Sequence, residues 1–164
     1  MRRAFHSLIP HSCLLAAAVV LLWPCDAVAD KVPRFASLKA DEANLRTGPG
    51  ERYPIDWVLT KKGLPVEIVA EFDVWRKVHD SEGSEGWVHQ RLLAGSRTVL
   101  IVGNIRVLRT EPDAAAPAVA RAEPGVIARL LECRGPWCRI EAQDIKGWLR
   151  RSEVWGVYPD EVVQ

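Results

Sequence analysis

The sequence predicts an all-β protein in which two small barrels follow an N-terminal export signal. Three observations support this prediction. The chain opens with basic residues and an apolar run, its later apolar segments are short and separated by Pro, Gly and Asp, and its second half repeats the first. Short apolar segments between turn residues are typical of antiparallel strands in small β domains.

The first 29 residues have the pattern of a secretory signal peptide. Two arginines precede the apolar run 13–23, and small residues follow as far as Ala29. This order predicts cleavage between Ala29 and Asp30. The run is much shorter than the roughly twenty apolar residues that span a bilayer. We therefore expect a periplasmic or secreted protein without a membrane span after cleavage. General secretion is favoured over the twin-arginine route, because no cofactor motif requires export in a folded state.

An internal repeat divides the rest of the chain. "LRTGPGERYPIDWVLTKKG" begins at Leu45, and "LRTEPDAAAPAVARAEPG" begins at Leu108. Downstream, "WRKV" matches "WCRI" and "EGWVHQRLLAG" matches "KGWLRRSEVWG" in the same register. The repeat predicts one domain over 35–95 and a second over 98–158. Because the link between them is so short, the two domains are expected to form a semi-rigid pair.

Within each unit the apolar segments predict strands rather than helices. The first unit contains "PVEIVAE", "WRKVH" and "GWVH", and the second contains "IARLLEC", "WCRIEA" and "GWLR". These segments are short, partly alternating and rich in Val, Ile, Leu and Trp, as expected of antiparallel strands joined by tight turns.

This pattern resembles the bacterial SH3 domain. The strongest matches are the segment "NLRTGPG" from Asn44, the strand "WRKV" from Trp75 and "GWV" from Gly86. The ending "WGVYPDE" from Trp155 resembles that of exported proteobacterial SH3-domain proteins. The resemblance implies two tandem SH3-like β-barrels and a non-catalytic role in holding peptidoglycan or its peptides. The second copy has "RTEPDAAAP" in place of the Gly-Pro-Gly loop and its tyrosine, so loop-mediated binding is expected mainly in the first copy.

The first copy supplies the candidate ligand-binding residues Arg46, Tyr53, Trp57 and Trp75. Large amphipathic rings in or beside a loop are good contact residues. Trp57 is the strongest candidate, because the second copy has Ala or Val in its place. The glycines of "RTGPGERYP" do not predict a phosphate site, since the Lys-Ser/Thr ending and the following helix are absent from the sequence.

Two other tryptophans are expected to pack in the small cores. Trp87 and Trp148 both follow glycine at equivalent strand positions. A buried Trp contributes a large apolar area, which a domain of this size needs.

The remaining cysteine pair predicts a structural disulfide. Cys133 and Cys138 align with Glu71 and Arg76 of the first copy. If "RGPW" is a hairpin connection, the two cysteines lie opposite each other on adjacent strands, and the first copy closes the same hairpin with an ion pair. Export to an oxidising compartment favours the bond. A redox site is the weaker alternative, because reactive pairs are usually two residues apart near a helix start.

The sequence offers little for catalysis or cofactor chemistry. After cleavage only His79 and His89 remain as histidines, and no nucleophile elbow or zinc-binding spacing is present. We expect no enzyme activity, no cofactor and no metal. The whole chain has 22 basic and 21 acidic residues, and 20 of each follow residue 29. This balance argues against nucleic acid as a partner.

The sequence therefore favours a binding module for cell-wall (peptidoglycan) peptide or for an envelope protein. The alternative is a scaffold or accessory subunit of an envelope enzyme that binds no small ligand. A thiol-disulfide oxidoreductase is a third, weaker hypothesis.

Overall fold

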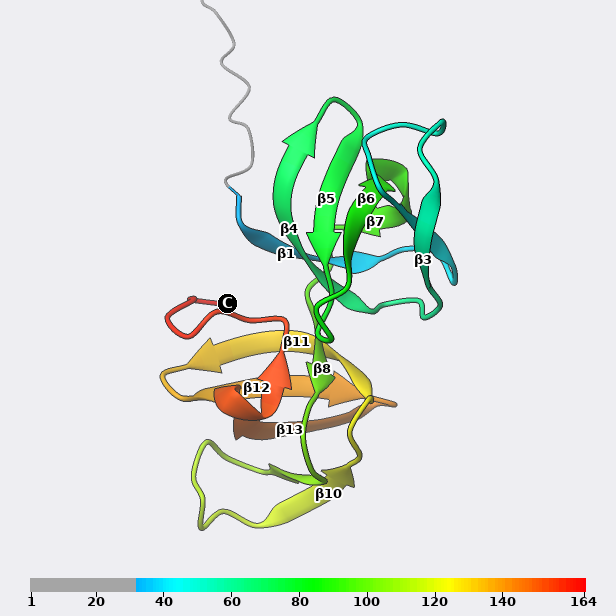
Figure 1. Cartoon of the computed structure of the whole chain (residues 1–164). Coiled ribbons are helices and arrows are strands. Elements are labelled where there is room, and N and C mark those ends of the chain that lie inside the picture. Colours follow the sequence, from blue (N-terminus) through cyan, green and yellow to red (C-terminus); the bar gives the residue numbers. More distant parts are fainter. Residues whose placement is uncertain (1–31) are drawn as a thin grey trace, which may run out of the picture. The chain divides into compact units, whose positions relative to one another are not determined.

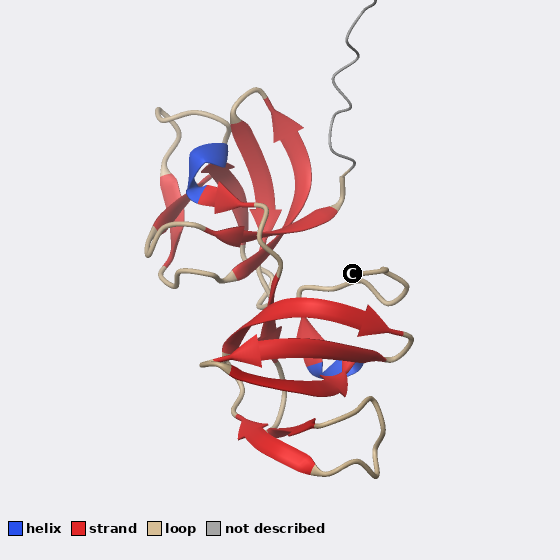
Figure 2. Cartoon of the chain, turned by 180° about the vertical axis from the view of Figure 1, so that it is seen from behind, coloured by secondary structure: helices blue, strands red, loops and turns tan. Residues whose placement is uncertain are grey.

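The computed structural model describes residues 32–164, which belong to one compact unit. The expected signal peptide and its cleavage site at Ala29 and Asp30 lie outside the described residues. The described chain folds into two seven-stranded antiparallel sheets with two short 3-10 helices (Figures 1 and 2). The all-β prediction is therefore confirmed. No helix among residues 32–164 is long and apolar enough to cross a membrane.

The first sheet forms the first barrel and the second sheet forms the second barrel. The elements of the first are β1 (Arg34–Leu38), β2 (Ala43–Arg46), β3 (Ile55–Leu59), β4 (Pro65–Phe72), β5 (Trp75–His79), β6 (Glu85–His89), η1 (Gln90–Leu92) and β7 (Leu93–Ala94). Those of the second are β8 (Thr98–Ile101), β9 (Arg106–Arg109), β10 (Ala118–Ala122), β11 (Ile127–Arg134), β12 (Trp137–Ala142), β13 (Ile145–Arg150), η2 (Arg151–Glu153) and β14 (Val154–Trp155).

The two sheets have the same topology. Their strand orders are β3-β2-β6-β5-β4-β1-β7 and β10-β9-β13-β12-β11-β8-β14, so each strand of the second barrel is the equivalent of the strand seven places earlier. The pairing registers agree as well, since Arg46 lies opposite Trp87 and Arg109 lies opposite Trp148. The repeat found in the sequence is therefore a repeat of the fold.

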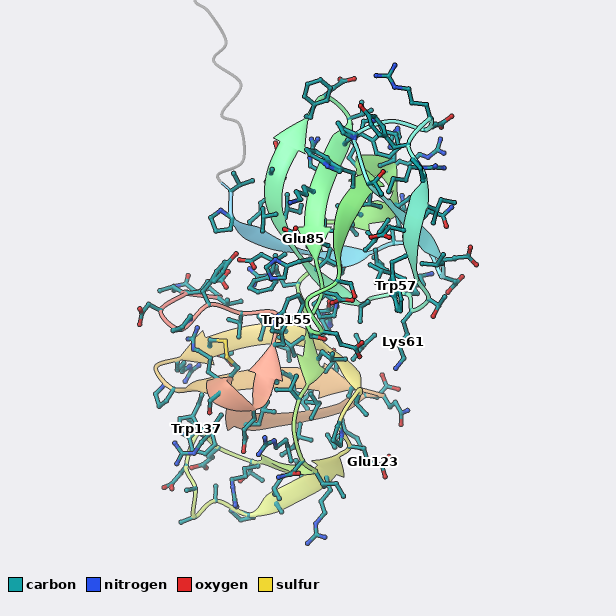
Figure 3. The ribbon with its side chains drawn as sticks, in the orientation of Figure 1. Trp57, Lys61, Glu85, Glu123, Trp137 and Trp155 are labelled. Carbon is teal, nitrogen blue, oxygen red and sulfur yellow. A yellow bond between two sulfur atoms is a disulfide. The ribbon has the colours of Figure 1, made fainter. Side chains whose placement is uncertain are left out.

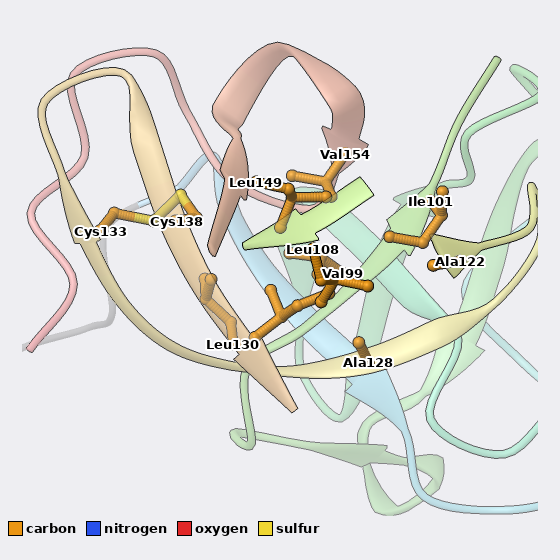
Figure 4. Packing of buried hydrophobic residues seen from close by; sticks show 11 residues of the cluster. Val99, Ile101, Leu108, Ala122, Ala128, Leu130, Cys133, Cys138, Leu149 and Val154 are labelled. Atoms are coloured by element: carbon orange, nitrogen blue, oxygen red, sulfur yellow. A yellow bond between two sulfur atoms is a disulfide. The ribbon is translucent and has the colours of Figure 1, made fainter. Parts of the chain in front are cut away.

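Each barrel has its own apolar core. Leu45, Val78 and Val88 are fully buried in the first, and Ile140 and Leu149 are fully buried in the second. Figure 4 shows how the side chains of the second core gather inside its curved sheet. Alternation along a strand places every second side chain in this core and leaves its neighbours on the outer face.

A glycine at the same strand position allows close packing in both barrels. A Cβ on Gly86 would lie 2.7 Å from the Cβ of Leu45, and a Cβ on Gly147 would lie 2.7 Å from the Cβ of Leu108. Such an approach leaves no room for a side chain. The glycine that precedes tryptophan in both copies is therefore required by the packing of the neighbouring strand.

The hairpin of each barrel is closed as the sequence predicted. Cys133 and Cys138 are opposite each other on β11 and β12 and form a disulfide. Glu71 and Arg76 occupy the same register positions, with 3.1 Å between Glu71 Oε1 and Arg76 Nε. The connection is shorter than the predicted "RGPW", because Arg134 and Trp137 pair as well. The turn therefore has two residues, and Gly135 takes the positive φ of 52° that such a turn requires.

Several contacts join the two copies within the compact unit. Thr98 Oγ1 donates to the carbonyl of Gly63 at 2.7 Å, and the Tyr158 hydroxyl donates to Glu67 Oε1 at 2.6 Å. The ring of Phe35 lies edge-on to that of Trp155, with 5.0 Å between centroids. The expectation of a semi-rigid pair stays a prediction. The predicted boundaries 35–95 and 98–158 stay predictions.

Candidate functional site

The most exposed tryptophan of the first barrel lies on an edge strand. Trp57 is on β3, which pairs only with β2 in the sheet order. Its neighbour across the strands is Leu45, a core residue, yet Trp57 itself is 55% exposed. An aromatic ring of this size left in contact with water is a good anchor for a ligand. Trp57 is therefore the centre of the candidate site (Figure 3).

A polar groove lies on one side of Trp57. Its volume is about 610 Å³, and we call it the β2–β6 groove. Its lining includes Arg46 and Trp57 of the predicted set. The other lining residues are Thr47, Asp56, Lys77, Gly83, Ser84, Glu85, Gly86 and Trp87. The groove combines an exposed ring with groups of both charges, so it can accept a ligand that carries both ammonium and carboxylate groups.

The charged residues of this groove are partly paired with one another. Lys77 Nζ lies 2.8 Å from Glu85 Oε2, and both side chains are substantially exposed. Exposed ion pairs contribute little to stability. A charged ligand can therefore replace either partner of this ion pair at a small cost in free energy, as expected of a recognition surface.

A second hollow lies on the other side of Trp57. It has a volume of about 300 Å³ and is lined by apolar groups such as Val58 and Leu64, by the acidic Asp80 and Glu82, and by Leu100 and Gly125 of the second barrel. Lys61 Nζ donates to the Gly125 carbonyl at 3.0 Å across this hollow. Because Trp57 lines both hollows, a ligand that covers its ring can reach either one.

Arg46 also has a structural role, because it holds the loop that follows β2. Its Nη1 donates to the carbonyl of Tyr53 at 2.7 Å and to that of Glu51 at 3.0 Å. In the second barrel, Arg109 Nη1 donates to the Ala116 carbonyl at 2.6 Å. The same brace therefore holds the loop in both copies. Arg46 lines the groove, but part of its donor capacity is committed to the loop.

Tyr53 packs inside its own loop rather than in the groove. A Cβ on Gly48 would lie 2.5 Å from Tyr53 Cδ1, so the ring covers the glycine at a distance that no other residue would permit. Arg52 stacks on the same ring, with 5.3 Å between its guanidinium carbon and the ring centroid. The glycine at position 48 is explained by this packing.

Trp75 is placed away from the groove. It is only 9% exposed, and its ring lies 5.5 Å from that of His89. Burial makes it a packing residue, and we leave it out of the proposed contact set. Trp87, for which packing was expected, is half-buried and lines the groove. Trp148 is buried as expected.

The groove residues Asp56, Lys77 and Glu85 were not singled out from the sequence. Lys77 and Glu85 alternate with buried residues, which marks them as outward-facing. Which outward-facing residues are neighbours on the surface depends on the strand order. Among residues 32–164 no group of three or more His, Cys, Asp or Glu side chains is arranged to hold a metal ion.

Comparisons with known proteins agree with this architecture. A family model described as "Bacterial SH3 domain" matches residues 39–95 and 102–156. The chain is 26% identical over 130 residues to YrvJ of Bacillus subtilis (strain 168), which is named as an N-acetylmuramoyl-L-alanine amidase. The matched region is 73% of this chain but only 25% of that protein.

Two solved structures are also similar. NlpC2 from Trichomonas vaginalis is 11% identical, with 81% of this chain and 51% of that chain covered at a TM-score of 0.37. An NlpC/P60 family protein from Bacillus cereus ATCC 10987 is 17% identical, with 74% and 55% covered at a TM-score of 0.34. The chain therefore spans about half the length of these structures, and similarity at this level carries no argument about function.

Proposed function

Because the chain belongs to the bacterial SH3 domain family, with tandem copies over residues 39–95 and 102–156, we propose that it is a cell-wall-related binding module without catalytic activity. The β2–β6 groove would hold a short peptide of peptidoglycan, with Trp57 as the anchor. The similarity to a protein named as an N-acetylmuramoyl-L-alanine amidase supports this ligand class and a location outside the cytoplasm.

The observation that carries the proposal is the exposed ring of Trp57 between two hollows. Peptidoglycan peptides carry both carboxylate and ammonium groups. The groove is lined by Lys77 as well as by Asp56 and Glu85, so both kinds of ligand charge can be met. A rigid ring on a strand binds at a low cost in conformational entropy.

A sedimentation assay with purified peptidoglycan tests the proposal. The chain from Asp30 onward should be retained, and Trp57→Ala should weaken retention at least about tenfold, the size expected when a central aromatic anchor is lost. Ile55→Ala is the matched control, because Ile55 is on the same strand and 48% exposed but is not among the residues that line the groove. It should bind like the wild type.

Failure would take one of two forms. If the wild type is not retained, or if Trp57→Ala and Ile55→Ala bind equally, the groove is not a peptidoglycan site. The scaffold hypothesis, in which the barrels bind an envelope protein and no small ligand, would then become the better explanation.

A further inference from the structure

The outer face of the second barrel carries cations interleaved with two tryptophans. Across β12 and β13, Trp137 lies opposite Arg150 and Arg139 lies opposite Trp148. Arg134 of β11 lies opposite Trp137. These side chains point away from the core, because their strand neighbours Cys138 and Leu149 are fully buried. We call this surface the arginine face, and it consists of Arg134, Trp137, Arg139, Lys146, Trp148 and Arg150.

Two of the guanidinium groups are stacked on the tryptophan rings. The guanidinium carbon of Arg150 lies 4.8 Å from the Trp137 ring centroid, and that of Arg134 lies 5.4 Å from the Trp148 centroid. Stacking fixes the plane of a guanidinium group and leaves its N–H edge available for oxygen acceptors. The side chain of Arg134 is still 68% exposed. The face therefore presents to solvent the stacked guanidinium of Arg150 and the remaining N–H groups of Arg134, whose Nε and Nη2 donate to Glu132.

The carboxylates on this face do not balance its cations. Glu132 is shared by Arg134 and Arg139, at 2.8 Å and 3.4 Å. Glu141 is shared by Lys146, at 3.5 Å, and by Arg129. Two carboxylates thus pair with three cations of the face and with Arg129 beside it, and Arg150 is the fourth cation of the face. Incomplete neutralisation leaves a positive potential over the face, which attracts anions.

The equivalent face of the first barrel shows that the fold does not require three of these cations, although Lys77 has the position of Arg139. The strand registers place Phe72 where the second barrel has Arg134, Glu85 where it has Lys146, and His89 where it has Arg150. Residues 35–95 contain 8 basic and 10 acidic side chains, whereas residues 98–158 contain 9 and 7. The positive excess belongs to the second barrel alone.

From this charge pattern we propose that the arginine face binds an extended acidic polysaccharide through the carboxylates of the polysaccharide. A planar guanidinium matches the two oxygens of a carboxylate, and several such pairs in a row fit a polymer with repeated acidic groups. The exposed polar groups of the face can form hydrogen bonds with the sugar hydroxyl groups. This site is on a different barrel from the β2–β6 groove, and it does not depend on the function proposed for that groove.

Other anionic partners fit this face less well. Single-stranded nucleic acid needs open aromatic faces on which bases can stack, but Trp148 is only 5% exposed and both rings are covered by guanidinium groups. Membrane surfaces are bound by apolar side chains that project into the lipid, and on the arginine face the rings lie beneath the cations instead.

Titration calorimetry with polygalacturonate, with neutral dextran as the reference, tests this proposal. The wild type should bind polygalacturonate and not dextran, and added salt should weaken the binding. Arg139→Gln with Arg150→Gln should weaken it at least tenfold. The matched control is Arg52→Gln with Arg91→Gln, which removes two exposed cations from the first barrel and should bind like the wild type. Thermal unfolding of each variant reports whether it is folded.

Three results would overturn the proposal. The first is no binding of polygalacturonate by the wild type. The second is equal weakening by the two double variants, which would indicate a general charge effect. The third is equal or tighter binding of a thymidine oligonucleotide or of phosphatidylglycerol vesicles, which would assign the face to nucleic acid or to a membrane. Retention on peptidoglycan through Trp57 is independent of all three.

Discussion

The two barrels share their interior and differ on their surface. Leu45 and Leu108 occupy the same core position, each against a glycine of the next strand, and Arg46 and Arg109 brace the same loop. The outward positions have diverged, however. Trp57 of the first barrel corresponds to Ala120 of the second, since Leu45 lies opposite Trp57 and Leu108 opposite Ala120. The comparison teaches that the fold constrains the core and the loop brace, and leaves each outer face free to acquire its own ligand.

The equivalent tryptophans illustrate this divergence. Trp75 is buried and Trp87 half-buried in the first barrel, whereas Trp137 is half-buried and Trp148 buried in the second. In the second barrel Arg134 stacks on Trp148. In the first barrel Phe72 occupies the position equivalent to Arg134, and Trp87 lines the β2–β6 groove. One change of side chain thus accompanies the difference between a covered ring and an accessible one.

The largest expected effect concerns the shared core. Leu45→Ala and Leu108→Ala should each lower the free energy of unfolding by about 3 kcal/mol, because both remove a buried side chain from an equivalent position. Urea denaturation measures the loss. Val58→Ala, at an exposed position of β3, is the control and should change stability by less than about 0.5 kcal/mol. Losses at the two leucines that differ by more than about 1 kcal/mol would show that the cores are not equivalent.

Removing the pair that closes the hairpin should have a smaller effect on stability, and the effect should differ between the two barrels. Cys133→Ser with Cys138→Ser should cost about 2 kcal/mol, the value expected for closing so short a loop. Glu71→Gln should cost less, about 1 kcal/mol, because its ion pairs with Arg76 and Arg34 are only partly buried. Thermal unfolding without reductant measures both.

Reductant provides the control for this pair of variants. It should lower the melting temperature of the wild type to that of the cysteine variant and leave the cysteine variant unchanged. The prediction fails if Glu71→Gln is as destabilising as the loss of the disulfide. Conversely, Glu71→Cys with Arg76→Cys should form a disulfide in the first barrel, because that pair has the same register.

Much of this fold could be predicted from the sequence, because the relevant information is local or repeated. Apolar alternation marks the strands, and the repeat places Cys133 and Cys138 in the register of Glu71 and Arg76. That the two residues of each pair are opposite each other was predictable without any knowledge of the strand order. The length of the turn was overestimated, since the sequence does not show that Arg134 and Trp137 also pair.

The candidate site was predictable only in part. The groove is formed by side chains from β2, β3, β5 and β6 and from the loop before β6, and these meet only after the sheet has assembled. Trp57 was identifiable because the second copy lacks its counterpart. Trp75 was predicted as a contact candidate from its place beside a turn, which does not reveal that it is buried and that its ring contacts His89.

The smallest expected effect concerns the C-terminal tail 156–164, a feature that the first barrel does not have. Burial tends to raise the pKa of Glu161, but hydrogen bonds from Arg97 and from the Tyr158 backbone N–H outweigh it and hold the pKa below its usual value of 4.5. A carboxylate whose pKa is lowered by folding stabilises the folded state above the unfolded pKa, and that contribution disappears as pH falls through the folded pKa.

We therefore expect Glu161→Gln to melt at a lower temperature than the wild type at pH 7, and the difference to shrink progressively below about pH 4.5, the range in which the wild-type carboxylate takes up its proton. Melting curves measured from pH 7 to pH 3 test this. Asp160→Asn removes an exposed carboxylate from the same tail and should follow the wild type throughout. A difference for Glu161→Gln that persists unchanged at pH 3, or an equal effect of Asp160→Asn, would mean that the Glu161 charge does not hold the tail to the second barrel.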